Sequence, residues 1–296
     1  MPRAKSDKPK LSERISSYVA SEQPLRDLAG NLSKVAKTAL DEANTLTVEE
    51  VPIYLDRLPA KLDGFRIVHL SDIHHSRFTG LEHITNAVNI SNELKPDIVF
   101  LTGDYVSHDA AYIAPVAEAL GELKSTHGTF ACLGNHDHWT DADLVTHLLR
   151  GEGINVLINE GFRFAVKDSS FWLAGVDDFM AGKTDVSAAL RGSDSHEMKL
   201  LLAHNPVIFR QSVRANIDLT LSGHTHGGQI KMRDPERRIL PRRKLSSGLH
   251  SRKDSQIYIT RGIGTVVVPA RYQCPPEISL IELRMSSVAR EAATTE

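Results

Sequence analysis

The stretch FRIVHLSDIHHS (65–76) decides the fold class, because a short apolar run in it ends directly in polar residues. Phe65–Leu70 is expected to be a buried strand, and Asp72 and His74 follow it at once. The pattern recurs in VFLTGDYV (99–106), FACLGNHDHW (130–139), LLLAHNP (200–206) and LTLSGHTHGGQ (219–229). Because ligands in layered α/β domains gather beyond the carboxyl ends of strands, these stretches predict one shared site there.

Helical segments lie between these strands. Apolar residues at helical spacing predict helices over 81–94 and 110–124, with strands at 98–101 and 129–133. Further strands are expected at 171–176, 200–203, 219–221, 256–260 and 278–283. Alternation of buried strands and helices predicts a layered α/β or α+β domain with partly parallel strands.

The polar residues at the strand ends are types that bind metal ions. Asp72 and His74 stand two apart, so an extended turn can point both side chains at one ion. Asp104 has two carboxylate oxygens and can bridge two ions about 3.5–4 Å apart, the separation found in two-metal hydrolases.

The remaining candidates complete a mixed set of oxygen and nitrogen ligands. Asn135 offers a neutral oxygen, and three further residues offer neutral nitrogens: His204, His224 and His226. Such a mixture suits Mn, Fe, Zn or Ni. Glycines that permit tight turns directly precede several of the ligands: Gly103, Gly134 and Gly223.

In this order, the motifs D-x-H, G-D, G-N-H-D, a lone His and G-H-x-H resemble those of the calcineurin-like metallophosphoesterase superfamily, over about residues 63–285. The resemblance implies a four-layer sandwich of α/β (α+β) class, in which helices flank two mixed β-sheets. It also implies two divalent transition metal ions, Mn²⁺, Fe²⁺/Fe³⁺ or Zn²⁺, as cofactors. Family roles carried over to this sequence give the first ion Asp72, His74 and His226 and the second Asn135, His204 and His224, with Asp104 bridging.

The resemblance implies a chemistry as well. A hydroxide shared by the two ions would attack phosphorus in line, and His136 would act as general acid on the leaving oxygen. Many relatives carry a second Asp three residues after the bridging one, but this sequence has Ser107 there. Asp137 is then the candidate for orienting His136.

Three stretches of the sequence are similar to those of the YkuE/YaeI-type branch of bacterial phosphodiesterases: LSDIHHS (70–76), GHTHGGQI (223–230) and YITRGIGTVVVPARYQCPPEISLIEL (258–283). Some members of that branch are linked to cleavage of UDP-2,3-diacylglucosamine in lipid A biosynthesis. The resemblance thus implies a phosphodiester or pyrophosphate bond in a lipid-linked or nucleotide-sugar substrate. A nuclease or cyclic-nucleotide phosphodiesterase is the alternative. A non-catalytic metal-binding scaffold is a third, which the complete ligand set disfavours.

Several residues outside the motifs are candidates for substrate contact. His75 follows the first motif, and the guanidinium of Arg271 would match a phosphate, although a structural ion pair is equally in keeping with its type. Lys231–Lys253 is locally basic and includes Arg242 and Arg243. This segment suits an extended anionic substrate or an anionic lipid surface, with a solvated loop as the plain alternative. No aromatic-rich groove accompanies it, which disfavours single-stranded nucleic acid.

The chain divides into four predicted parts. A basic, disordered tail (1–10) and a helical arm (11–45) precede the catalytic domain (46–286), and a flexible tail (287–296) follows. The arm contains one apolar stripe, formed by Leu25, Leu28, Leu32 and Val35. This stripe would pack against the rest of the chain, form a dimer or lie on a membrane.

Composition sets the compartment. The net charge of −2 and 41% hydrophobic residues are ordinary for a globular protein. No apolar stretch approaches the ~18 residues of a membrane-spanning helix, and no apolar region of a signal peptide follows the basic N-terminus. Two cysteines, Cys132 and Cys274, cannot build a disulfide framework, so we expect a cytoplasmic protein, with peripheral contact at the inner face of the membrane as the alternative.

Overall fold

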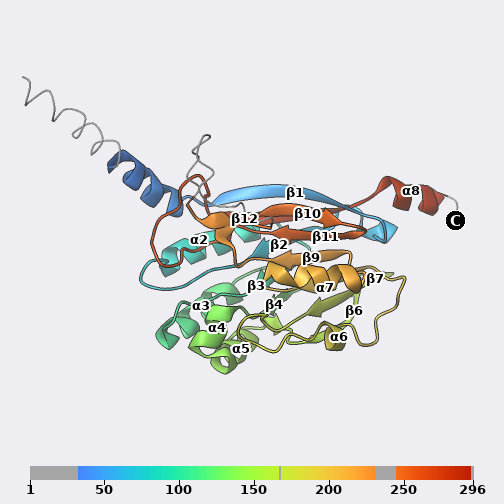
Figure 1. Cartoon of the computed structure of the whole chain (residues 1–296), viewed down its shortest axis with the longest axis horizontal. Coiled ribbons are helices and arrows are strands. Elements are labelled where there is room, and N and C mark those ends of the chain that lie inside the picture. The colour runs from blue at the N-terminus through green and yellow to red at the C-terminus, as the bar shows by residue number, and fades with distance from the viewer. Residues whose placement is uncertain (1–32, 167, 231–244, 295–296) are drawn as a thin grey trace, which may run out of the picture.

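Two six-stranded mixed sheets face each other at the centre of the computed structural model, which describes residues 33–166, 168–230 and 245–294 (Figure 1). The first sheet has the order β1 (Thr47–Leu55), β12 (Glu277–Met285), β2 (Arg66–Leu70), β3 (Ile98–Thr102), β4 (Thr129–Cys132) and β5 (Asn155–Val156). The second has the order β10 (Gly248–Arg252), β11 (Ser255–Ile259), β9 (Leu219–Ser222), β8 (Lys199–Leu202), β7 (Ser169–Gly175) and β6 (Glu160–Val166).

Each sheet has a block of four parallel strands. β2, β3, β4 and β5 run parallel in the first sheet, and β11, β9, β8 and β7 do so in the second. The outer strands β10 and β6 pair antiparallel with their neighbours, as β12 does with β2. The carboxyl ends of each parallel block therefore lie at one edge of its sheet.

Alternation along the strands builds the layers. In β2 and β3, Ile67 and Phe100 point into a core shared by both sheets, whereas Val68 and Val99 point to the outer face of the first sheet. Leu200 of β8 joins the shared core from the opposite sheet. Because side chains alternate between faces, strands that are apolar throughout must be buried on both sides.

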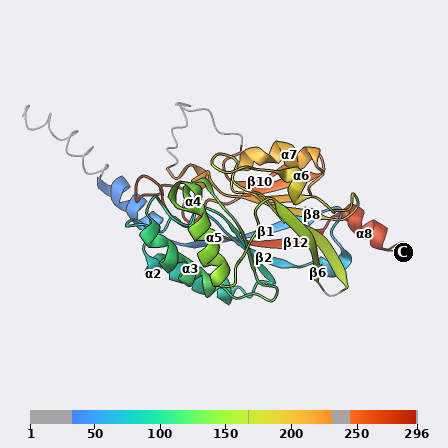
Figure 2. The ribbon, with the colours of Figure 1, turned by 90° about the horizontal axis from the view of Figure 1, so that it is seen from below.

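Helices cover both outer faces, as Figure 2 shows. The first sheet packs against α2 (Leu81–Glu93), α3 (Ile113–Gly121) and α5 (Ala142–Gly151). The second packs against α6 (Val186–Ala189) and α7 (Phe209–Arg214). Short helices complete the fold: η1 (Ala60–Leu62), η2 (Ala110–Tyr112), α4 (Asn135–Thr140), η3 (Pro206–Ile208), η4 (His226–Gly228) and α8 (Ser287–Thr294). The predicted four-layer sandwich is confirmed.

Some predicted elements differ in detail. The helix expected over 110–124 is the 3₁₀ turn η2 followed by α3, which ends at Gly121. β1, β6 and β10 were not predicted; each is an edge strand, and most of its positions are exposed or only half-buried, so no apolar run marks it. A flexible tail was expected from residue 287, where the structure has helix α8.

The described part of the arm is a helix over residues 33–43. Leu25, Leu28 and Leu32 of the predicted stripe lie outside the described residues, and Val35 is exposed. Ala39 and Ala43 form the buried face instead. The Glu42 carboxylate accepts the backbone N–H groups of Gln273 and Cys274, which attaches this helix to the loop after β11. Within the described residues, no helix is both long and apolar enough to cross a bilayer.

Phe100 tests the shared core, because it is fully buried between the sheets. Phe100→Ala should lower the free energy of unfolding by about 3–5 kcal/mol, through lost burial and the cavity left behind. Chemical denaturation followed by circular dichroism measures the loss. Tyr54→Ala, at an exposed position of β1, is the control and should cost about 1 kcal/mol or less. Equal losses in the two variants would contradict the assignment of the core.

Candidate active site

The backbone turns sharply where ligands follow strands. Five predicted ligands have positive φ, between 48° and 69°: Asp72, His74, Asp104, His224 and His226. Non-glycine residues rarely occupy this left-handed region, and they gather at functional sites when they do. The loops after β2 and β3 support each other, since the N–H groups of Asp72 and His74 bond to the carbonyls of Gly103 and Asp104.

Two glycines leave room for the ligands. A Cβ on Gly134 would lie 2.2 Å from Oδ1 of Asp104, and one on Gly223 would lie 2.2 Å from Oδ2 of Asp72. Side chains at these positions would displace the carboxylates. The motif glycines are thus required by close approach to the ligands.

A first group of ligands surrounds Asp72. Its Oδ1 lies 3.2 Å from Nε2 of His226 and 3.9 Å from Nε2 of His74, and these two nitrogens are 3.1 Å apart. The side chains of Asp72 and His74 are fully buried, and that of His226 nearly so. Three ligand atoms of Asp72, His74 and His226 therefore converge on one point.

A second group lies beside the first and shares Asp104 with it. Oδ2 of Asp104 lies 3.5 Å from Nε2 of His74 and 3.1 Å from Nε2 of His204. Nδ1 of His224 is 3.0 Å from Oδ1 of Asn135 and 3.3 Å from Nε2 of His204. The structure thus brings all seven predicted ligands together, and one oxygen of Asp104 faces both groups.

The donor set fits divalent cations. Nδ1–H of His204 donates to the carbonyl of Thr102 at 2.6 Å, which turns its Nε2 toward Asp104. Nδ1 of His74 hydrogen-bonds Oγ of Ser107 at 2.8 Å, which likewise turns its Nε2 inward. Hydrogen bonds of this kind orient histidine ligands in metal sites. A cation between the two groups would satisfy carboxylate oxygens and imidazole nitrogens that otherwise crowd one another.

The pKa values agree with this arrangement. Burial lowers the pKa of His74 to about 3, so its imidazole is neutral and free to bind a cation. Burial by itself lowers the pKa of His204, but the carboxylates around it, Asp104 foremost with Asp72 and Asp178, together raise it to about 10. Without a cation, the proton on His204 offsets the charge of Asp104, and a bound ion would take over that role.

A family model described as calcineurin-like phosphoesterase matches residues 65–228, more than half of the chain. This chain belongs to the calcineurin-like phosphoesterases. Phosphodiesterase YaeI of Escherichia coli is 35% identical over 226 residues, which cover 74% of this chain and 82% of that protein. The chain is accordingly a metal-dependent phosphoester hydrolase.

Two further relatives of this phosphoesterase come from Bacillus subtilis and Danio rerio. The metallophosphoesterase YkuE of Bacillus subtilis is 30% identical, over 83% of this chain and 88% of that protein. A transmembrane protein with a metallophosphoesterase domain from Danio rerio is 33% identical over 81% of this chain. The match spans 57% of that longer protein.

Asp137 does not orient His136 in this phosphoesterase, contrary to the candidate role given to it. Its buried carboxylate accepts the backbone N–H groups of Asp104, Tyr105 and Gly134, each at 2.8 Å. Burial, with the nearby Asp104, raises the pKa of Asp137 to about 7. Asp137 joins the second and third motif loops, so it positions Asp104.

His136 is held by aromatic rings. Its ring centroid lies 4.7 Å from that of His74, 4.7 Å from that of His108 and 4.8 Å from that of Trp139. The His108 and Trp139 rings are stacked on each other at an interplanar angle of 8°. Sequence reasoning assigned no role to either residue. The sequence feature that could have indicated these contacts is Trp139, the aromatic residue at the end of FACLGNHDHW (130–139).

Ser107 contacts His74 and not His136. It therefore orients a metal ligand, at the position where many relatives have an Asp. His75, a candidate for substrate contact, is buried, and its Nδ1 bonds to the carbonyl of Thr79 while its ring packs on Tyr112. Nothing in these contacts directs the His75 side chain toward the metal ligands.

Arg271, for which the sequence left a phosphate contact and a structural ion pair equally open, is fully buried. Its guanidinium donates to the carbonyls of Arg261, Gly262, Gly264 and Cys274, and burial lowers its pKa to about 10. These bonds hold the loop after β11 in shape. Arg242 and Arg243 lie outside the described residues.

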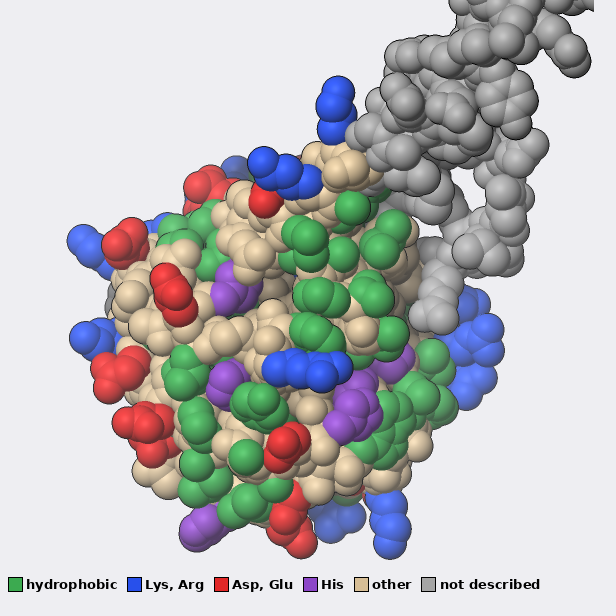
Figure 3. Space-filling model, turned by 90° about the vertical axis from the view of Figure 1, so that its left-hand side faces the viewer, with side chains coloured by type: hydrophobic (Ala, Val, Ile, Leu, Met, Phe, Trp, Pro, Cys, Tyr) green, Lys and Arg blue, Asp and Glu red, His purple; other side chains and the backbone are tan. Residues whose placement is uncertain are grey.

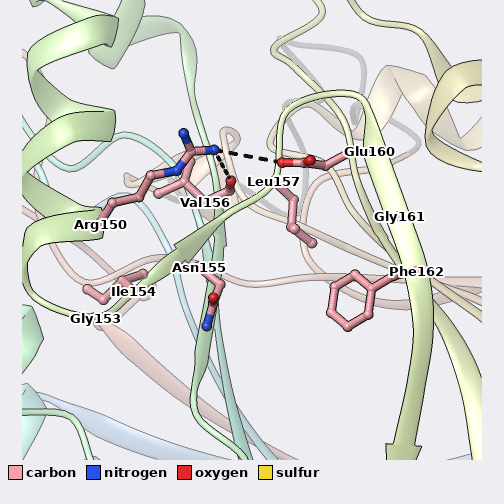
Figure 4. Close-up of a pocket in the computed structure, with 9 residues that line it drawn as sticks. All are labelled: Arg150, Gly153, Ile154, Asn155, Val156, Leu157, Glu160, Gly161 and Phe162. Carbon is pink, nitrogen blue, oxygen red and sulfur yellow. Dashed lines mark hydrogen bonds and ion pairs between the residues drawn. The ribbon is translucent and has the colours of Figure 1, made fainter.

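A cavity of about 500 Å³ lies where β5 and β6, edge strands of the two sheets, come together (Figure 4). Arg150 crosses it to the carbonyl of Val156 and toward Glu160, and Phe162 lies on the far side. None of the metal ligands lines this cavity. The chemistry of this phosphoesterase therefore belongs to the strand ends.

Ser107→Ala should weaken metal binding to the first group by about 10–100-fold, because His74 would lose the bond that fixes its ring. Calorimetric titration of the metal-free protein with Mn²⁺ or Zn²⁺ measures the affinity. Ser107→Thr keeps the hydroxyl and is the matched control. Wild-type affinity in Ser107→Ala, with an intact circular dichroism spectrum, would show that Ser107 does not orient His74.

Proposed function

We propose that this phosphoesterase hydrolyses a phosphodiester or pyrophosphate bond with two divalent transition metal ions at the paired ligand groups. The observation that carries the proposal is the position of Asp104. One of its oxygens faces His74 from the first sheet and His204 from the second, at 3.5 and 3.1 Å. A bridging carboxylate between two ions is the arrangement used for in-line displacement at phosphorus.

When bound, the two ions would supply Lewis acidity toward the phosphate oxygens and a water of lowered pKa. In the proposal, Asp72, His74 and His226 hold one ion and Asn135, His204 and His224 the other. Oδ1 of Asp104 accepts the backbone N–H of His136 at 2.8 Å, so the bridging residue also fixes the position of the His136 backbone. Ligand placement and acid placement thus depend on the same carboxylate.

His136 would protonate the leaving oxygen. Its Nδ1 is buried with no partner among the described residues, so Nε2 is the nitrogen that can reach a substrate. Burial lowers the pKa of His136, although Asp104 partly offsets that effect. An anionic phosphate beside the ring would favour its protonated form. The low intrinsic pKa would then make the imidazolium a strong proton donor.

Manganese, iron and zinc all suit ligands that are imidazole, carboxylate and amide groups without thiolate. Cys274 lies close by, but its Sγ donates to the carbonyl of His226 and it is not part of either ligand group. For the substrate, we propose a lipid-linked or nucleotide-sugar phosphoester, such as UDP-2,3-diacylglucosamine. The phosphodiesterase YaeI and the transmembrane relative from Danio rerio support a diester near a membrane.

His136→Ala should lower kcat by about 10²–10⁴-fold for a diester with an alkoxide leaving group. The loss should be smaller for bis-p-nitrophenyl phosphate, because nitrophenolate leaves without protonation. Asp104→Asn should lower turnover of both substrates by more than about 100-fold. Loss of a mere hydrogen-bond partner of a metal ligand already lowers metal affinity or activity by about 10–100-fold, and Asp104 is itself a ligand in the proposal. Steady-state kinetics with metal analysis measures these effects. Near-normal activity of Asp104→Asn at full metal content would refute the mechanism.

The substrate class is tested by a comparison of kcat/KM with Mn²⁺, Fe²⁺ and Zn²⁺ in turn. We expect UDP-2,3-diacylglucosamine or a phospholipid diester to exceed nucleotides and cyclic nucleotides by at least about tenfold, since contacts to remote parts of a true substrate contribute to catalysis. A preference for cyclic nucleotides or oligonucleotides would replace this substrate with the alternative one. If the protein released mononucleotides from those substrates, the proposed two-metal mechanism would still stand, and only the proposed substrate would be wrong.

A further inference from the structure

Exposed apolar side chains gather on the loops that follow the parallel strands. Six such loops, after β2, β4, β7, β8, β9 and β11, each present at least one large hydrophobic residue that is 38% to 85% exposed. One residue from each loop defines what we call the apolar rim: Phe78, Trp139, Phe179, Val207, Ile230 and Val267. Because four of these loops, after β2, β4, β8 and β9, also carry metal ligands, the rim lies beside the metal centre.

Contacts place the rim loops beside the ligands. The Trp139 ring packs on His136 at 4.8 Å. Thr79, next to Phe78, accepts the N–H of Thr265 through its Oγ1, so the loops after β2 and β11 touch. Gln229, next to Ile230, donates from Nε2 to the carbonyls of residues 266, 268 and 270. Figure 3 shows histidines (purple) reaching this face among hydrophobic side chains (green).

Val267 is the most prominent residue of the rim. Its side chain is 85% exposed, and its φ is +66°. A β-branched residue in this left-handed region is strained, and water offers no compensation for its apolar side chain. The surrounding Gln229 bonds hold the loop in this conformation. Strain combined with full apolar exposure points to a surface that the loop meets in function.

Basic residues lie beside one rim residue and follow another in the sequence. The Arg77 guanidinium lies 4.6 Å over the Phe78 ring. Directly after Ile230, residues 231–244 contain seven Lys or Arg and only two acidic residues. The helix over 33–43, which bonds to the loop after β11, carries Lys34 and Lys37. Apolar side chains for insertion with basic residues nearby are the combination that binds anionic bilayers.

We propose that the apolar rim docks on the surface of a bilayer that contains anionic phospholipid, with the metal centre turned toward the headgroups. Docking itself does not depend on the proposed function. Direct access to a phosphoester anchored in that bilayer does rest on it. Phe78, Trp139 and Phe179 would sit at the level of the headgroups, where aromatic side chains are favoured.

A second copy of the chain fits this face less well. The rim consists of tips on separate loops around a centre that must stay open to substrate, and a copy seated on it would cover the ligands. The basic residues near the rim would also face those of the partner, which is repulsive. A bilayer presents anionic headgroups to the same residues and leaves substrate accessible from the lipid side.

Co-sedimentation of the full chain with phospholipid vesicles tests docking. We expect binding to vesicles of phosphatidylcholine with phosphatidylglycerol, and weaker binding to phosphatidylcholine alone. Val267→Asp and Phe179→Asp should each lower binding by at least about tenfold, because a carboxylate at the rim opposes both insertion and anionic lipid. Asp tolerates the left-handed backbone at position 267, so folding should survive that change.

Tyr54→Asp is the matched control. Tyr54 is 54% exposed near the carboxyl end of β1, and β1 and β12 run opposite to β2, so Tyr54 lies at the edge away from the rim. Its vesicle binding should equal that of the wild type. All four proteins should hydrolyse bis-p-nitrophenyl phosphate equally in solution, which separates failure of docking from failure of the proposed function.

Three outcomes would overturn the proposal. The first is absence of vesicle binding by the wild type, and the second is an equal loss of binding in the Val267→Asp and Tyr54→Asp variants. The third is a concentration-dependent dimer in sedimentation equilibrium that Val267→Asp abolishes while vesicles bind nothing, which would assign the rim to a second copy.

Discussion

Asp104 sets one carboxylate oxygen between His74 and His204, which follow strands of different sheets. This contact fixes how the two sheets stack, because the carboxyl edges of both parallel blocks must meet within a few ångströms. The shared apolar core holds the sheets together but has no direction of its own, whereas the ligand groups demand one register. Asp137 reinforces it by bonding three backbone N–H groups of the Asp104 and Gly134 loops.

The arrangement of residues at the carboxyl edges of the two sheets is locally unfavourable in free energy. Carboxylates and imidazoles are buried together, five ligands have left-handed backbone conformations, and two glycines approach the carboxylates too closely for any Cβ. Such groups stay buried only when they are paired or bind a cation. The folded protein and its metal ions are therefore thermodynamically coupled, and the metal-free chain should be less stable than the loaded one.

The same edge determines how a substrate arrives. The segments after β2, β4, β8 and β9 carry ligands near their starts and an exposed apolar side chain farther along, so polar chemistry lies beside an apolar margin. Arg271 supports this margin from the interior, because its buried guanidinium donates to backbone carbonyls of the loop that carries Val267. A residue that the sequence left open as a phosphate contact or an ion-pair partner thus shapes the margin of the site through the backbone.

The sequence alone determined the strand–helix alternation, the ligand motifs and the family resemblance, because apolar runs and motif order are local properties of a chain. It could not reveal the edge strands β1, β6 and β10, which are mostly exposed or half-buried, or helix α8, whose Ala289 packs against residues far away in sequence. Only the tertiary structure decided that Ser107 orients His74, that His108 and Trp139 hold His136, and that Arg271 is buried. Each of these contacts depends on which loops meet in space, and that is settled by the stacking of two sheets, not by spacing along the chain.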